Sequence, residues 1–295
     1  MQSDSSNTLK VSDMIKKIIN FMYGLRDRQR IIIGLTKGSA MMGARKIDLK
    51  FPQTWEFSGF SQNGEDGILD VLRRQLKKSN RYFIEIGSAD GIDNNSAWLT
   101  IAEKYQGMMI EGSSDLVTRA KRMVGHYSLG LQVVNMFVDV DTVGKIKELA
   151  QYDDPDVMSL DIDGIDYYVA KALLNEGFRP KIFVVEYNSV YGPNSSKTIQ
   201  YRRNFVYTQA HSSELYYGVS IAGWKKFFKE NDYQFVTVDR NGVNGFFVDP
   251  DCFDSKFLSG IESLHFSENQ LQLLKFRTNY ESQFKLIQDM PFHEI

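Results

Sequence analysis

Residues 81–114 read RYFIEIGSADGIDNNSAWLTIAEKYQGMMIEGSS. Residues 82–86 are apolar and rich in β-formers, which favours a buried strand, and a helix is predicted after the glycine-bearing turn that follows. A second apolar run, 107–110, ends at Glu111. The span of about 30 residues matches a βαβ unit with two parallel strands. Because ligands of such sheets bind at the carboxyl ends of the strands, we expect the turn and Glu111 to share one cleft.

The turn combines two glycines, Gly87 and Gly91, with the carboxylate of Asp90. Glycine lets a ligand approach the backbone because no Cβ intrudes. A carboxylate about 20 residues later, such as Glu111, can accept both hydroxyls of a ribose. The spacing differs from G-x-G-x-x-G, and an acid inside the turn repels phosphate. The pattern therefore favours S-adenosylmethionine (SAM), a cationic adenosine compound without phosphate, over a dinucleotide. An ordinary turn with a solvated Asp90 is the alternative.

The overall composition is that of a soluble globular chain of 295 residues, with 42% hydrophobic and 24% charged residues. The net charge of −2 gives no argument for nucleic-acid binding. One cysteine, Cys252, excludes an internal disulfide framework and thiolate-rich metal sites. A cytoplasmic, reducing location is predicted. The sequence shows no secretory signal and no apolar run of membrane-spanning length.

Residues 1–50 contain ten basic and four acidic residues, which makes a local balance of ten minus four, or +6. Apolar residues recur at helical spacing from Val11 to Leu35. A basic amphipathic helix of this kind can lie on an anionic membrane surface, so peripheral membrane contact is one expectation. Packing of the helix on its own domain or on a second subunit of a homo-oligomer is the other.

The polar cluster from Ser61 to Asp66 precedes a predicted helix. The cluster could lay Gln62 and Glu65 over the cofactor cleft. The alternative is that these residues only cap the helix, with Asn63 or Asp66 as the N-cap.

The apolar run 131–138 predicts a third strand, and Asp139 and Asp141 lie just past its end. A side chain at this position, such as Asp139, could bond an adenine amino group. For Asp141, an N-cap of the next helix is at least as good an interpretation.

The fourth and fifth predicted strands end in D-I-D-G-I-D and E-Y-N, so that Asp161, Asp163, Glu186 and Asn188 should reach one edge of the sheet. An all-oxygen cluster suits Mg²⁺ or Ca²⁺ rather than zinc, and Asp163, Glu186 and Asn188 are the candidate metal ligands. General base catalysis by Asp163 or Asp161 without a metal is the second interpretation, and capping is the third.

Residues 188–214 form a long stretch without periodicity, rich in tyrosine and carrying Arg202 and Arg203. Tyrosine faces suit sugar rings and paired arginines suit carboxylate or phosphate, although a plain surface loop explains the composition too. His211 is the lone candidate for a proton acceptor near neutral pH, and it can equally be incidental.

An amphipathic helix is predicted over 213–230 and a hairpin over 233–248, which completes a mixed seven-stranded sheet. Residues 253–295 are expected to be helical, as an appendage or an oligomer contact.

Five motifs in this order resemble those of the FkbM-like SAM-dependent methyltransferases: SQNGEDGIL, FIEIGSADGIDNN, MMIEGS, LDIDGIDYYVAKAL and FVVEYN. The resemblance implies an α/β fold of the Rossmann-like class I methyltransferase type, with the sheet order 3-2-1-4-5-7-6 and helices on both faces. It covers residues 57–250, taken as the methyltransferase domain. Residues 1–56 are then a helical N-terminal extension and residues 251–295 a helical C-terminal appendage.

The family's functional positions map onto this chain residue by residue. The resemblance implies a SAM-binding set of Glu85, Gly87, Asp90, Gly91 and Glu111. It also places Asp161 and Asp163 beside the transferring methyl group. Many relatives carry glutamate where this chain has Asp163, which leaves the identity of the base open.

The sequence therefore predicts an O-methyltransferase that uses SAM to methylate a sugar hydroxyl in polysaccharide biosynthesis, with Mg²⁺ as a candidate second cofactor. The base would be Asp163, Asp161 or His211. A non-catalytic scaffold domain that docks through its N-terminal helix is the main alternative, and a nicotinamide-dependent oxidoreductase is a weaker one. A glycoconjugate substrate and a homo-oligomer are the expected partners.

Overall fold

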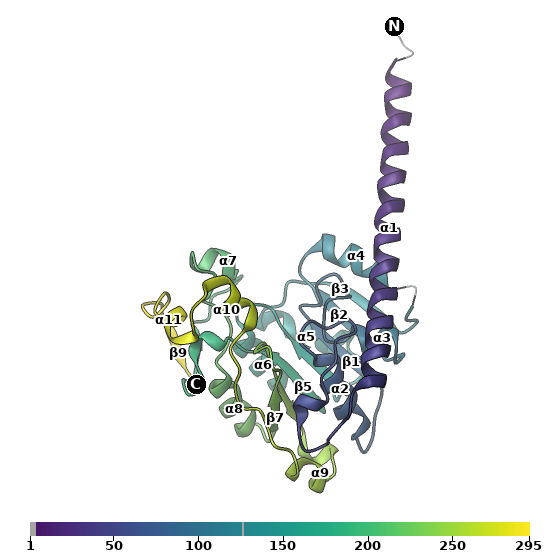
Figure 1. Cartoon of the computed structure of the whole chain (residues 1–295). Coiled ribbons are helices and arrows are strands. Elements are labelled where there is room, and N and C mark those ends of the chain that lie inside the picture. The colour runs from purple at the N-terminus through teal and green to yellow at the C-terminus, as the bar shows by residue number, and fades with distance from the viewer. Residues whose placement is uncertain (1–3, 126) are drawn as a thin grey trace.

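A computed structural model of the chain describes residues 4–125 and 127–295, and its centre is a seven-stranded sheet (Figure 1). The strand order is β3-β2-β1-β4-β5-β8-β7, in which β8 alone runs antiparallel to its two neighbours and the other six strands share one direction. The bounds are β1 (Tyr82–Ile86), β2 (Gln106–Glu111), β3 (Leu131–Asn135), β4 (Val157–Leu160), β5 (Ile182–Glu186), β7 (Gln234–Val238) and β8 (Asn244–Val248). This is the mixed sheet that the sequence predicts, with the strand order of the class I methyltransferase fold.

Helices cover both faces of the sheet because alternate strand residues point to opposite faces. On β1, Phe83 packs with the helices α2 (Glu65–Arg74), α3 (Ala97–Ile101) and α4 (Ser114–Val124). Its neighbour Ile84 packs with the helices on the other face: α5 (Val143–Leu149), α6 (Asp166–Asn175) and α8 (Ile221–Glu230). The inner strands β1, β4, β5 and β8 are buried on both sides, whereas the edge strands β3 and β7 are only partly buried.

Helix α8 begins later than the helical pattern over 213–230 predicts. Ser220 is its N-cap and accepts a hydrogen bond from the backbone N–H of Gly223. Gly218 and Glu214, earlier in the predicted span, have positive φ angles of 63° and 61°. A left-handed residue cannot continue a right-handed helix, so residues 213–219 form a turn-rich connection instead.

The C-terminal segment contains a strand as well as the expected helices. Its helices are α9 (Ser255–Ser259), α10 (Gln270–Phe276) and α11 (Tyr280–Phe284). Strand β9 (Phe292–Glu294) pairs antiparallel with β6 (Lys197–Ile199), which lies inside the stretch predicted to be irregular. The same stretch holds the short helix α7 (Tyr207–Ala210) and the 3₁₀ turn η3 (Ser189–Tyr191). The purely helical prediction for this segment is therefore wrong at its end.

Helix α1 (Asp4–Ala44) is one continuous helix, longer than the predicted span, and only its second half packs on the domain (Figure 1). Ile31 is buried there. Gly34 and Gly38 allow close approach, because an added Cβ would lie 2.4 Å from the ring of Phe60 and 2.3 Å from the ring of Trp98. Among the described residues, no helix is both long enough and apolar enough to cross a bilayer.

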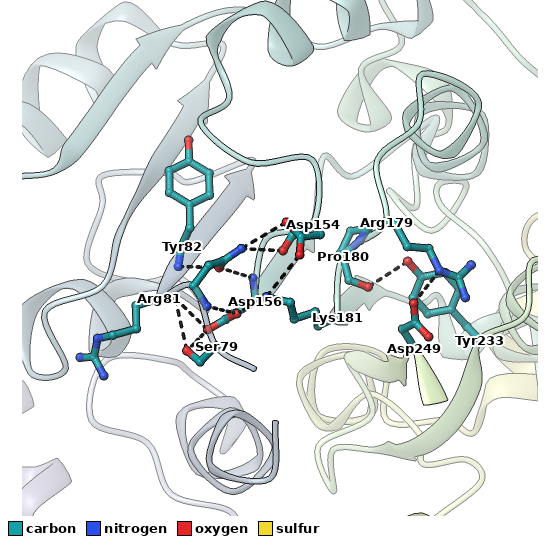
Figure 2. Close-up of polar contacts among 11 residues, drawn as sticks. Ser79, Arg81, Tyr82, Asp154, Asp156, Arg179, Pro180, Lys181, Tyr233 and Asp249 are labelled. Carbon is teal, nitrogen blue, oxygen red and sulfur yellow. Dashed lines mark hydrogen bonds and ion pairs between the residues drawn. The ribbon is translucent and has the colours of Figure 1, made fainter. Parts of the chain in front are cut away.

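Polar contacts hold the sheet together at the amino ends of its strands (Figure 2). The buried ammonium of Lys181, before β5, pairs with the buried carboxylate of Asp156, before β4, at 2.8 Å. Asp156 also accepts the backbone N–H of Arg81, before β1, at 3.0 Å. Arg179 pairs with Asp249 at 2.7 Å and thus joins β5 to the end of β8. These contacts stabilise the edge opposite to the one where the predicted site residues lie.

Candidate functional site

A cleft of about 490 Å³ opens at the carboxyl ends of β1, β2 and β4. Its polar lining includes five of the predicted site residues: Gln62, Gly87, Glu111, Asp161 and Asp163. The strand tips meet here because parallel neighbours end at the same edge of the sheet. The cleft is therefore where the βαβ pattern of the sequence predicts it.

Gly87, at the tip of β1, occupies a position that only glycine fits. Its φ is +88°, and an added Cβ would lie 1.6 Å from the carbonyl oxygen of Asp161 at the tip of β4. The N–H groups of Gly87 and Ser88 both donate to the carbonyl of Ile110, at 2.9 and 3.1 Å, and thereby attach the turn to β2. The three tips form one packed floor of the cleft.

Glu111, the last residue of β2, is held in place by the backbone on both sides. One carboxylate oxygen accepts the N–H of Ala89 at 3.0 Å, and the other accepts the N–H of Ser113 at 2.8 Å. Each carboxylate oxygen has a further lone pair, so the group can still accept two hydroxyls from a ligand in the cleft. Ala89 is itself in the left-handed region, with φ of +48°.

An apolar wall completes the cleft, and most of it was not predicted as part of the site. Its members are Ile110, Leu116, Met136, Phe137, Val138, Ile162, Ile165 and Phe205. The third strand was predicted to run to Val138, but β3 ends at Asn135, and the following three residues turn along the cleft. The sequence signal for Phe137 was the apolar run itself, which was interpreted as buried strand. Such a wall suits a flat heterocycle.

Three carboxylates form a compact cluster at the tips of β4 and β5. Asp161, Asp163 and Glu186 each offer an oxygen, and these atoms all lie within 4.8 Å of one another. Burial, together with the neighbouring carboxylates, raises the pKa of Asp161 and of Glu186 well above the ordinary range. Burial also raises the pKa of Asp163.

The cluster lacks compensating cations among the described residues. Oε2 of Glu186, a side chain only 8% exposed, has no hydrogen-bond partner in the described part of the chain. Carboxylates this close can all be ionised only if a cation lies between them. Without a cation, they must share a proton. We call Asp161, Asp163 and Glu186 the acid trio.

Asn188 does not belong to the acid trio, although it was predicted as a metal ligand. Its amide group donates to the carbonyls of Leu215 and Tyr217, at 2.8 and 3.0 Å. Its side-chain oxygen accepts the N–H of Val190 at 3.1 Å, as the N-cap of η3. The side chain therefore shapes the connection after β5, and Asp161 takes the third position among the carboxylates.

A smaller side pocket of about 90 Å³ adjoins the cleft, and Gln62, Gly87 and Asp161 line both. Its lining includes Glu85, whose pKa burial raises to about 8. One oxygen of Glu85 accepts the N–H of Asn95 at 3.2 Å, and the other has no partner among the described residues. A buried acid with an unused oxygen is suited to a cationic group of a ligand.

Glu65 lines the side pocket with Asn95 and Asn244, two residues absent from the sequence-based prediction. Asn244 donates its amide to Glu65 at 2.8 Å. Neither Asn63 nor Asp66 is the N-cap of α2, because Gly64 holds that position with φ of +98°. The carboxylate of Asp66 instead accepts the backbone N–H groups of residues 59–61.

Asp90 and Gly91 belong to the turn but do not line the cleft. Burial acts to raise the pKa of Asp90, but the hydrogen bond and charge of Arg30 of α1, with smaller contributions from the N–H of Ile92 and the charge of Arg119, together hold the pKa below its usual range. The Arg30–Asp90 pair measures 2.6 Å, and Arg119 adds a second contact at 3.0 Å. Gly91, with φ of +81°, lies against Ala120 of α4. The predicted cofactor contacts of these two residues are therefore replaced by structural ones.

Asp139 and His211 also lie outside the cleft lining. Asp139 is buried, caps the 3₁₀ turn η2 (Val140–Thr142) and accepts the hydroxyl of Tyr201 at 2.6 Å, so it is not placed to bond an adenine. His211 contacts Ser213 through Nδ1 at 2.8 Å, at the end of α7. Neither residue has the position that the sequence-based interpretation gave it.

Comparisons with known proteins found solved structures only; no protein-family model and no curated protein matches the chain. An O-methyltransferase from Streptomyces achromogenes involved in tomaymycin synthesis, in complex with SAM, is 16% identical, with 64% of this chain and 80% of that chain covered and a TM-score of 0.42. An O-methyltransferase from Bacillus cereus in complex with S-adenosylhomocysteine is 13% identical, with 74% and 89% covered and a TM-score of 0.40.

A SAM-dependent methyltransferase from Geobacter sulfurreducens, in complex with S-adenosylhomocysteine, is 14% identical, with 66% of this chain and 70% of that chain covered and a TM-score of 0.36. Identities and TM-scores of this size do not determine the chemistry of this chain.

Proposed function

We propose that this protein transfers the methyl group of SAM to a hydroxyl of a sugar in a polysaccharide or glycoconjugate. The observation that carries the proposal is the layout of one cleft, which has a hydroxyl-accepting carboxylate and an apolar wall at the tip of β2 and is lined at the tip of β4 by Asp161 and Asp163 of the acid trio. Such a cleft can hold an adenosine at one end and a reacting hydroxyl at the other.

The cofactor groups each match a feature of the cleft. The apolar wall around Phe137 suits the adenine ring, and the carboxylate of Glu111 suits the two ribose hydroxyls. The side pocket, with its buried acid Glu85, suits the ammonium of the methionyl group. The sulfonium then lies between these two ends, close to Gly87 and Asp161, which line both cavities.

The acid trio supplies the chemistry of the acceptor. As the acceptor oxygen forms its bond to the methyl carbon, the bond from that carbon to sulfur breaks, and S-adenosylhomocysteine leaves. The hydroxyl proton passes to a carboxylate, Asp163 or Asp161. A carboxylate whose pKa is raised by burial is a stronger base than an exposed one, and in-line alignment of oxygen, carbon and sulfur supplies much of the rate.

The trio also fits a hard divalent cation. Its donors are all carboxylate oxygens, and the buried Oε2 of Glu186 lacks a partner among the described residues. A bound Mg²⁺ would be held by Asp161, Asp163 and Glu186 and would lower the pKa of the acceptor hydroxyl. Without a cation, the trio shares a proton and one carboxylate acts as the base. Both arrangements serve the same transfer.

Aromatic side chains beside the trio support a sugar as the acceptor. The charge of Asp163 raises the pKa of Tyr207. The rings of Tyr207 and Tyr217 are 5.7 Å apart, and Phe205 lines the cleft itself. Flat faces of this kind pack on the apolar faces of sugar rings.

The first test is a calorimetric titration of the protein with SAM. We expect binding by the wild type and about tenfold to hundredfold weaker binding by Glu111→Ala, because two hydrogen bonds to a charged group are lost. Glu230→Ala, at an exposed position of α8, is the matched control and should bind like the wild type. No heat with the wild-type protein would refute the methyltransferase proposal. Equal affinity in Glu111→Ala would refute the ribose assignment alone.

The second test separates the two forms of the chemistry. Transfer from radiolabelled SAM to a panel of nucleotide sugars and polysaccharides is measured with Mg²⁺ and with a chelator. If the trio holds a cation, Glu186→Gln should lower the transfer rate at least about a hundredfold. The chelator should then lower the rate of the wild type by a similar factor. If the chelator has no effect, the base mechanism remains. Full activity in both Glu186→Gln and Asp163→Asn would remove the trio from the reaction.

A further inference from the structure

Helix α1 carries an exposed apolar face in addition to the face that packs on the domain. Its members recur at helical spacing and are between 43% and 67% exposed: Met14, Ile15, Ile18, Phe21, Met22, Leu25 and Ile32. We call these residues the outer stripe. Residues three and four apart lie on one side of a helix, so the outer stripe is continuous from Met14 to Leu25, over about three turns, and Ile32 lies on the same side two turns further on.

The outer stripe is separate from the contact between α1 and the domain. That contact uses Ile31, Gly34 and Gly38, which lie on a different side of the helix from Leu25 and Ile32. In Figure 1 the first half of α1 projects clear of the domain. An apolar surface of this length on an exposed helix marks an interaction site.

The exposed charges along the described part of α1 are cationic. Arg26, Arg28 and Lys37 are exposed, whereas the acid Asp27 is buried and accepts a hydrogen bond from Arg122 of α4 at 2.9 Å. The outer stripe is therefore bordered by positive charge without an exposed carboxylate among the described side chains from Met14 to Ala44.

This charge pattern decides between two occupants of the outer stripe. A second copy of the chain would place cationic borders against cationic borders, which is unfavourable across a helix–helix contact. A bilayer with anionic headgroups accepts the apolar residues below the headgroups and the cations at their level. We propose that α1 docks this protein on an anionic membrane surface by its outer stripe, lying in the interface without crossing it.

The placement of α1 links this surface to the cleft. Arg30, on the same helix, pairs with Asp90 and Asp93 of the turn after β1, both at 2.6 Å. The free half of α1 extends past the end of the molecule that carries α4 and α7, and α4 begins directly after Glu111 and the cleft (Figure 1). A docked protein would thus hold its cleft near the lipid surface, where a lipid-linked glycan could reach it.

The test is co-sedimentation of the full chain with phosphatidylcholine vesicles, with and without phosphatidylglycerol. We expect binding to the anionic vesicles that weakens as salt is added, and at least about tenfold weaker binding by the triple variant Ile18→Ser, Phe21→Ser and Met22→Ser. Arg26→Gln with Arg28→Gln should lose the salt-dependent part of the binding. Leu271→Ser with Leu274→Ser, two exposed leucines of α10, is the control and should bind like the wild type.

Two results would overturn the proposal. One is the absence of binding to anionic vesicles, or equal binding by the wild type and the triple variant. The other is a dimer, seen by light scattering, that dissociates in the triple variant while neither protein binds vesicles; the outer stripe would then contact a second copy. Circular dichroism and SAM titration report whether each variant is folded. The vesicle result does not depend on the proposed reaction, since SAM titration tests that separately.

Discussion

Glu85 is the one carboxylic acid in the buried strand β1, and the free energy that its burial costs the fold depends on pH. Burial raises its pKa to about 8, from an ordinary value of 4.5. The folded protein therefore holds the proton more tightly than the unfolded chain does. The stability linked to this group is present below the ordinary pKa and is lost as pH rises toward the raised one.

We predict that Glu85→Gln removes this loss. Without SAM, the free energy of unfolding of the wild type should fall between about pH 4.5 and pH 8, by up to about 1.4 kcal/mol per pH unit from this group. The variant should equal the wild type near pH 4.5 and exceed it increasingly toward pH 8. Urea unfolding at a series of pH values measures the difference, with Glu230→Gln as the exposed control. Parallel curves for Glu85→Gln and the wild type would contradict the assignment.

The same residue should matter in the opposite sense for the ligand. If its unused oxygen meets the cofactor's ammonium, Glu85→Gln weakens SAM binding while it stabilises the unliganded protein. A stability cost located at the binding site is a common exchange between function and folding.

Among the elements, β4 and β5 are joined at their amino ends by the buried Lys181–Asp156 pair (Figure 2). We predict that Lys181→Met lowers the free energy of unfolding by about 3–5 kcal/mol, because it leaves a buried carboxylate without its cation. Lys256→Met, at an exposed position of α9, should change the stability little. Urea unfolding at neutral pH measures both.

The double variant Lys181→Met with Asp156→Asn tests the cause. It should recover part of the loss, because the unpaired charge is gone while the amide can still accept the N–H of Arg81. If the decreases in the free energy of unfolding caused by Lys181→Met and by Asp156→Asn simply add, the contact between these two side chains is not how Lys181 stabilises the fold.

The sheet was predictable element by element because its strands are short apolar runs that end at polar residues. The end of β2 at Glu111 and the turn at Gly87 were predicted from the polar and glycine residues that end these runs. Elements of weak local signal were missed, such as β9, whose three residues form a strand only by pairing with β6, far away in sequence. Local periodicity cannot indicate a pairing of that kind.

Within the site, backbone position was predictable and side-chain direction was not. Parallel topology brings Asp161 and Glu186 to one edge, as expected. Asn188 was misassigned because nearby carbonyls engage its amide. Asp90 was expected in the cleft, but its carboxylate pairs with Arg30, 60 residues earlier, and does not line the cleft. Such partners become visible only when the chain is folded.

At the scale of the whole molecule, α1 shows that a helical pattern does not predict which side of the helix packs on the domain. The spacing of its apolar residues predicts a helix, but not that one side of it packs on the domain while the outer stripe faces away. The difference depends on Gly34 and Gly38, which bring one side of the helix against Phe60 and Trp98. Helix packing selects the side on which close approach is sterically allowed.

The network at the amino ends of the strands, around Asp156 and Lys181, has a consequence for how such a protein can diversify. The ionic contacts that keep the framework intact lie at the opposite edge of the sheet from the loops around the cleft. Replacements in those loops can therefore accumulate over generations without loosening the framework. A lineage could thereby acquire new ligands for the cleft while keeping one inherited architecture.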